Sequence, residues 1–175
     1  MTNINKFQKG FTLIELLVVI AILGVLAAAV LVAINPLEQL ARGRDSGRKS
    51  SVNQIGHAVE SYFTSQNSVY PIQGATWMTT LVTGGELKLA PTNPSATGYT
   101  TGCNTANVAQ NGICYQTNAT NAIVYVRAES ASSETAAGCT AGQQAWIVWS
   151  SADGKTGLAC TAAASDPPIG ITGLL

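Results

Sequence analysis

The sequence predicts an α+β protein in which a long N-terminal helix packs on a small antiparallel sheet with disulfide-closed loops. Three observations predict this fold. An apolar run fills residues 11–36, an amphipathic helical pattern continues it over 37–66, and short β-rich segments separated by turn signals follow. We therefore divide the chain into a leader (1–10), an apolar membrane-spanning helix, an amphipathic helix and a globular head (67–175).

The apolar helix is interrupted by few polar residues. From residue 11 to 34 only Thr12, Glu15 and Gly24 depart from the apolar pattern. As a helix this run would be ~36 Å long, enough to cross a bilayer core of about 30 Å with some tilt. A carboxylate in such a helix costs roughly 2–3 kcal/mol or more at the membrane centre, so it usually marks function and implies a partner. Glu15 is therefore the first candidate functional residue.

The junction between the leader and this helix carries a recognisable motif. Residues 9–16 read KGFTLIEL. They resemble the processing site of type IV prepilins and type II secretion pseudopilins, in which a short basic leader ends in Gly and is followed by Phe and, four residues later, by Glu. The resemblance covers residues 6–36 and implies a pilin-like version of the predicted fold. It also implies that a membrane-embedded aspartyl prepilin peptidase cuts between Gly10 and Phe11 and methylates the new N-terminus on Phe11.

The chemistry of these residues agrees with the resemblance. Cleavage would create an ammonium group on Phe11, and Glu15 of a neighbouring subunit could pair with it inside the membrane, where the attraction is less screened than in water. Glu15 would then set the axial register of the incoming subunit. The resemblance thus implies a structural subunit of a type IV pilus or pilus-like filament, with Phe11 and Glu15 as assembly residues.

The resemblance also implies partners and a location. The partners are the prepilin peptidase/methylase, identical or related pilin subunits, an assembly ATPase and a platform protein. The chain would cross the inner (cytoplasmic) membrane once, with its N-terminus inside, before entering an extracellular or periplasmic filament. The orientation comes from the resembled family, because the positive-inside rule is ambiguous here. Basic residues stand on both sides of the apolar helix: Lys6, Lys9, Arg42, Arg44, Arg48 and Lys49.

Two alternative functions of the apolar run stay open. An ordinary secretory signal would use Lys6 and Lys9 as its basic region and residues 27–29 as its cleavage site. However, the run is longer than a usual signal and contains Glu15. A plain single-pass anchor would carry Glu15 incidentally. Neither alternative accounts for Gly, Phe and Glu at this spacing.

Alternatives to a pilus subunit also stay open. The neutral, Thr- and Asn-rich head favours an exposed pilus surface, whereas the Tyr70-Pro71 pair and the spaced prolines of residues 87–94 are typical of a type II secretion pseudopilin. That proline loop often carries Asp before its second Pro in the family, and Asn93 stands there in this sequence. An alternative from another class is a membrane-anchored binding module that does not polymerise.

Charge and the remaining polar residues indicate no catalytic or nucleic-acid site. The chain has nine basic and nine acidic residues, and only three of the basic residues lie beyond residue 66. The basic cluster at residues 42–49 is interpreted as a solvated or subunit-facing part of the amphipathic helix, in which Asp45 pairs with Lys49. His57 has no Ser, Cys or Asp pattern around it that would form a triad. We therefore predict a protein that is not an enzyme.

The four cysteines all lie in the head. An even number of cysteines in an exported domain favours two disulfides over a metal site, because no His lies near them and no pair has C-x-x-C spacing. Three pairings are possible. We favour Cys103 with Cys114 and Cys139 with Cys160, since each pair closes a local loop. The acidic residues of the head are widely spread, so we expect no calcium site, no other metal and no cofactor.

The elements of the head are predicted from turn signals and apolar segments. A short helix is expected at 76–83 and loop over 95–122. About three antiparallel strands should pack on the amphipathic helix, and the chain after Ala162 should be irregular. The predicted strands are 123–127, 145–150 and 156–161, the last two joined by a turn at Asp153-Gly154. Trp77, Trp146 and Trp149 are assigned to packing rather than to a ligand-stacking platform.

Overall fold

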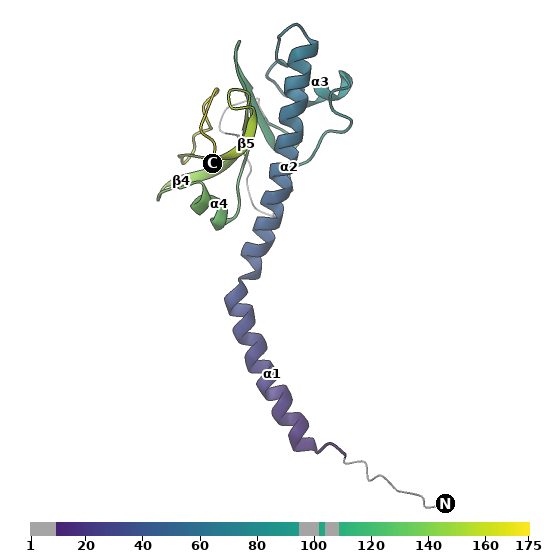
Figure 1. Ribbon diagram of the computed structural model, residues 1–175, viewed down its shortest axis with the longest axis vertical. Coiled ribbons are helices and arrows are strands. Elements are labelled where there is room, and N and C mark those ends of the chain that lie inside the picture. Colours follow the sequence, from purple (N-terminus) through teal and green to yellow (C-terminus); the bar gives the residue numbers. More distant parts are fainter. Residues whose placement is uncertain (1–9, 95–101, 104–108) are drawn as a thin grey trace, which may run out of the picture. The chain divides into compact units, whose positions relative to one another are not determined.

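The computed structural model describes residues 10–94, 102–103 and 109–175. The chain divides into two compact units, Met1–Gln39 and Leu40–Leu175, and we call the second the globular unit. In chain order the elements are α1 (Leu13–Ile34), α2 (Pro36–Ser65), α3 (Trp77–Thr83), β1 (Ala109–Gln110), β2 (Ile113–Thr117), β3 (Ala122–Arg127), α4 (Ala131–Ala136), β4 (Gln143–Ser150) and β5 (Lys155–Ala162) (Figure 1).

Helix α1 is long and apolar enough to cross a membrane, judged by its length and composition. Its 22 residues correspond to about 33 Å of helix, and all of them are exposed within the chain. The helix ends at Asn35, whose φ of 45° is left-handed. Asparagine tolerates this conformation better than most residues. Pro36 then begins α2, where its missing N–H leaves no intrahelical bond unmade.

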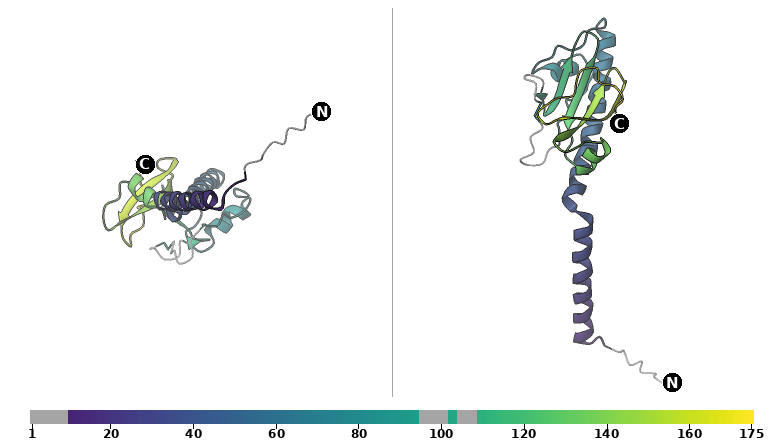
Figure 2. Two further views of the ribbon diagram at one scale, coloured as in Figure 1. Left: turned by 90° about the horizontal axis from the view of Figure 1, so that it is seen from below. Right: turned by 90° about the vertical axis from the view of Figure 1, so that its left-hand side faces the viewer.

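Among the described residues of the globular unit, five antiparallel strands form one sheet in the order β1-β2-β3-β4-β5 (Figure 2). Each strand pairs with the next along the chain, and the connection between β3 and β4 contains helix α4. The longest hairpin joins β4 to β5 through residues 151–154, where Gly154 has a φ of 63°. The strands predicted at 123–127, 145–150 and 156–161 lie within β3, β4 and β5.

Helix α2 covers one face of this sheet (Figures 1 and 2). Val52, Ile55 and Val59 recur at helical spacing and are fully buried against it. Gly56 makes the closest approach, because a Cβ atom there would lie 2.2 Å from Cγ of Trp149 on β4. The indole of Trp149 therefore occupies space that only a glycine leaves free.

The C-terminal segment covers the opposite face. Leu174 packs with Tyr125 and Trp146 in a second apolar cluster. The N–H of Leu158 donates to the carbonyl oxygen of Leu175 at 2.8 Å, and the N–H of Leu175 donates back at 3.2 Å. The segment after Ala162 contains no helix or regular strand, but it pairs with the edge strand β5 and covers the sheet. Both faces of the sheet are covered, so apolar residues follow one another along β3 and β4 instead of alternating with polar residues.

The prediction of loop over 95–122 is wrong for the C-terminal part of that range, which forms β1 and β2. Strand β2 runs from Ile113 to Thr117 and is largely buried, and with β1 it brings the described strands to five instead of about three. A tight turn at Asn111 and Gly112 joins it to β1, with φ values of 53° and 76°. Asn-Gly is a strong hairpin signal, because both turn residues tolerate positive φ. Residues 95–101 and 104–108 lie outside the described part of the chain.

Two disulfides link the loops of the globular unit to its strands. Cys103 is bonded to Cys114 on β2, and Cys139 to Cys160 on β5. These are the two local pairings favoured from the sequence. The three tryptophans are fully buried, and Trp77 stacks on Tyr115 with ring centroids 4.7 Å apart. They therefore belong to the packing of the unit, as predicted.

Candidate functional site

The first turn of α1 holds the residues singled out by the sequence. Thr12 is the N-cap, with extended backbone angles, and Glu15 is the third residue of the helix. The N–H of Thr12 donates to Oε2 of Glu15 at 2.8 Å, and its hydroxyl donates to the same oxygen at 2.7 Å. Oγ1 of Thr12 in turn lies 3.3 Å from the N–H of Glu15. The two residues thus form a reciprocal capping box.

This capping box matters most in an apolar environment. The first N–H groups of a helix have no partner within the helix, and each unsatisfied group in hydrocarbon costs several kcal/mol. Thr12 and Glu15 satisfy two backbone N–H groups there. Glu15 also gains two hydrogen bonds for its own carboxylate, which lowers the cost of placing that carboxylate among lipid chains.

The surroundings of Glu15 are apolar. Phe11, Ile14, Glu15, Val18 and Val19 line a shallow hollow on this end of the segment. Phe11 is 79% exposed within the chain. Gly10 precedes it and has no heavy atom near the position of a Cβ. The predicted processing and assembly residues are therefore exposed, and a single carboxylate stands beside an apolar hollow.

Comparison with known families matches this segment. Residues 5–31 fit the model described as the prokaryotic N-terminal methylation motif. The chain carries a prepilin-type cleavage and methylation motif. This motif is the one found in type IV pilins and pseudopilins, so the resemblance inferred from KGFTLIEL is confirmed. No curated protein and no solved structure matches the chain.

The prepilin-type motif and the apolar α1 fit a membrane-anchored, pilin-like protein. The motif also indicates a structural subunit rather than an enzyme. Sequence reasoning identified Gly10, Phe11 and Glu15 but missed the role of Thr12. The pattern T-x-x-E at residues 12–15 is a known signature of a capping box and contained that information.

Outside the prepilin-type motif, a buried group of charges joins α2 to the segment between β3 and α4. Arg48 is only 1% exposed. Its guanidinium donates to Oδ1 of Asp45 at 2.7 Å, to Oε2 of Glu129 at 2.8 Å and to Oδ1 of Asn93 at 2.8 Å. Arg44 forms a second ion pair with Glu129. One arginine thus connects three separate parts of the chain.

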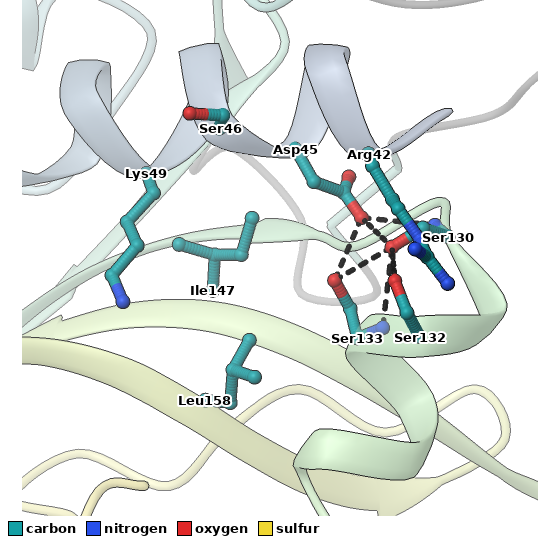
Figure 3. Close-up of a pocket in the computed structure, with 9 residues that line it drawn as sticks. All are labelled: Arg42, Asp45, Ser46, Lys49, Ser130, Ser132, Ser133, Ile147 and Leu158. Carbon is teal, nitrogen blue, oxygen red and sulfur yellow. Dashed lines mark hydrogen bonds between the residues drawn. The ribbon is translucent and has the colours of Figure 1, made fainter. Parts of the chain in front are cut away.

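Asp45 completes this group. It is 6% exposed and accepts hydrogen bonds from the N–H and hydroxyl of Ser130, at 2.9 and 2.7 Å, and from the hydroxyl of Ser133 at 2.9 Å (Figure 3). The N–H of Glu129 donates to it as well, at 2.9 Å. Ser130 is at the same time the N-cap of α4. Asp45 therefore fixes where α4 begins.

The basic cluster at residues 42–49 was predicted to be solvated or subunit-facing, and this prediction is wrong for Arg48, which is buried. The predicted pairing of Asp45 with Lys49 is also wrong. Asp45 pairs with Arg48, three residues on, and not with Lys49. The reason lies in the helical period, because Asp45 and Arg48 share the α2 face of Val52 and Ile55. That periodicity places both charges on the buried side, where each requires a partner.

The stability of the globular unit should fall at acidic pH through these two carboxylates. Burial tends to raise the pKa of Asp45, but hydrogen bonds from Ser130, Glu129 and Ser133 outweigh it and lower that pKa. The bond from Arg44 lowers the pKa of Glu129, and Arg48 adds to this. Carboxylates whose pKa is depressed by folding stabilise the fold above their unfolded values, here 3.8 and 4.5, and this contribution is lost as the pH falls through the folded values.

We therefore expect the urea midpoint of the globular unit to fall between pH 7 and pH 3. Asp45→Asn should flatten this pH dependence, because it removes one of the two groups. Glu134→Gln, a change of an exposed carboxylate on α4, is the matched control. An Asp45→Asn variant with the full pH dependence of the parent protein would contradict this assignment.

Proposed function

We propose that this chain is the structural subunit of a type IV pilus or pilus-like filament. Prepilin peptidase would cleave after Gly10 and methylate Phe11, and the mature subunits would assemble by packing of their N-terminal helices. The observation that carries the proposal is the prepilin-type motif at residues 5–31, placed on a helix of membrane-spanning length. A disulfide-linked globular unit is consistent with export of the part that follows.

In this proposal α1 anchors the subunit in the inner membrane with the N-terminus inside until it is extracted into the filament. The partners are the peptidase, other pilin subunits, an assembly ATPase and a platform protein. The new ammonium group of Phe11 would pair with Glu15 of a neighbouring subunit. Thr12 supports this role, because its hydrogen bonds hold the Glu15 carboxylate at the end of the helix.

The first experiment is the mass of the N-terminal peptide of the protein recovered from its native membrane. The expected result is a chain that begins at methylated Phe11. A chain beginning near residues 28–30 would indicate an ordinary secretory signal, and an intact Met1 would indicate a plain anchor. Either of these results would overturn the proposal.

Glu15→Ala should leave processing and membrane insertion intact but reduce the filament recovered by shearing to a small fraction. Two variants separate the charge of Glu15 from its capping role. Glu15→Gln can still accept the hydrogen bonds of Thr12 but lacks the charge, so it should assemble as poorly as Glu15→Ala. Thr12→Val keeps the charge and loses only hydroxyl bonds, worth about 0.5–2 kcal/mol, so it should assemble better than Glu15→Gln. Normal assembly of Glu15→Gln would contradict the ion pair.

A type II secretion pseudopilin is the second candidate within the same class. Tyr70-Pro71 and the proline loop at residues 87–94 favour it. Within the structure, Asn93 of that loop accepts a hydrogen bond from Arg48. Deletion of the gene distinguishes the two functions, since loss of surface filaments points to a pilus and loss of exported enzymes to a secretion pseudopilus. A membrane-anchored module that does not polymerise would be absent from sheared material in both cases.

A further inference from the structure

A groove on the globular unit is lined by α2, the start of α4 and strands β4 and β5 (Figure 3). Its volume is about 270 Å³. Ile147 and Leu158 lie beneath the groove between the strands and the helix, and of the two only Leu158 is partly exposed. Arg42 and Lys49 of α2 stand at its two ends, and the hydroxyl of Ser132 lies beside Arg42. The groove therefore combines a small apolar surface with cationic ends.

The positive charge of this groove is only partly balanced. Asp45 also lines it, but its carboxylate is occupied by Arg48 and by the hydrogen bonds of Ser130 and Ser133. Lys49 is exposed, and within the described part of the chain no carboxylate lies within ion-pair distance of it. The groove thus favours an occupant that carries a carboxylate next to an apolar side chain.

The segment from Glu86 to Pro91, which we call the 86–91 loop, has this composition. The carboxylate of Glu86 accepts hydrogen bonds from the hydroxyls of Ser61 and Ser65 on α2. None of the described basic side chains pairs with it. Leu89 is 77% exposed, although it is a large apolar residue. The loop therefore presents an uncompensated carboxylate and an uncovered leucine.

The groove and the loop lie on different sides of α2. Leu89 lies beside Gln54, since both line the same surface hollow. Gln54 follows Lys49 by five residues, which corresponds to roughly 140° around the helix and about 7.5 Å along it. The loop and the groove are therefore different surfaces, so one copy can contact one neighbour through its loop and another neighbour through its groove. A contact used head to tail in this way joins each copy to the next, as a filament requires.

We propose that the 86–91 loop of one subunit docks into the groove of the next subunit of the filament. Glu86 pairs with Lys49 across this interface, and Leu89 packs on the partly exposed Leu158. The occupant is a second copy of this chain, so the inference rests on the proposed filament function and specifies one of its interfaces.

The test is a charge exchange in the full-length protein expressed in its native host. Lys49→Glu and Glu86→Lys should each lower the filament recovered by shearing about tenfold, because each places like charges opposite each other at every interface. The double variant Lys49→Glu/Glu86→Lys should restore most of the yield. A folding defect of either single variant could not produce that recovery. Glu60→Lys, a charge change on α2 about 16 Å beyond Lys49, is the control and should leave the yield unchanged.

The outcomes separate the interface from the filament function. If the parent protein forms filaments and the double variant is no better than the single variants, the interface is wrong while the function stands. If the parent protein forms no filaments, the proposed function fails and the interface falls with it. Binding to phosphatidylglycerol vesicles that is lost in Lys49→Glu and kept in Glu86→Lys, with no recovery in the double variant, would assign the groove to a lipid headgroup and overturn the proposal.

Discussion

Gly56→Ala is expected to lower the free energy of unfolding of the globular unit by about 3 kcal/mol or more, at the upper end for overpacked cores. The added Cβ would lie 2.2–2.5 Å from three indole atoms of Trp149. Neither side of this contact can yield easily, because α2 is held to the sheet by Val52 and Ile55 and the indole is fully buried. Unfolding in detergent micelles, followed by tryptophan fluorescence with the disulfides intact, measures the effect.

Gly43→Ala is the matched control. Gly43 lies in the same helix and has no heavy atom within 4 Å of a Cβ position. Alanine should therefore stabilise the helix there, by roughly 0.5–1 kcal/mol, since it loses less backbone entropy than glycine. If both variants shifted stability equally, the close contact between Gly56 and Trp149 would not be the cause.

The sequence predicted the fold best where one pattern of apolar residues continues over a long segment. The apolar run of α1, the apolar strands β3 and β4 and the helical spacing of Val52, Ile55 and Val59 were all predicted, and β5 was predicted from the turn at Asp153-Gly154. The hairpin of β1 and β2 was missed, because residues 95–122 are rich in small polar residues that mask a strand of only five residues. Burial of that strand comes from its neighbours in the sheet, which local composition does not report.

The candidate functional residues likewise fall into a group that the sequence could predict and a group that it could not. The N-terminal motif is local in sequence, so it could be recognised from residues 9–16, and the roles of Gly10, Phe11 and Glu15 are predictions that follow from this resemblance. The group around Arg48 is not local, because Glu129 lies 81 residues from it and Asn93 lies 45 residues from it. Helical periodicity places Arg48 on the buried face, but only the folded chain supplies its partners. Asn93 stands where the resembled family often has Asp. In this chain its amide oxygen accepts a hydrogen bond from Nε of Arg48.

Arg48→Ala is expected to be among the most destabilising single changes in the globular unit, at about 3–5 kcal/mol. Removal of the guanidinium leaves Asp45 without its cation in a nearly dry environment and removes one of two arginines from Glu129. Two junctions should loosen together: the start of α4 at Ser130 and the proline loop at Asn93. Hydrogen exchange should therefore increase at the amides of Glu129 and Ser130, which donate to Asp45, and at the amide of Asn93, which donates to the carbonyl oxygen of Asn111.

Arg44→Ala tests whether this cost comes from burial rather than from charge alone. The side chain of Arg44 is 27% exposed, and Glu129 keeps Arg48 when Arg44 is removed, so the expected loss is about 1 kcal/mol or less. Arg48→Lys keeps the charge but cannot reach Asp45, Glu129 and Asn93 at once with a single ammonium group, so it should recover only part of the loss. Equal costs for Arg44→Ala and Arg48→Ala would mean that net charge stabilises this junction. A large difference, with partial recovery in Arg48→Lys, would mean that the three directed bonds of one buried guanidinium hold α2, the proline loop and α4 together.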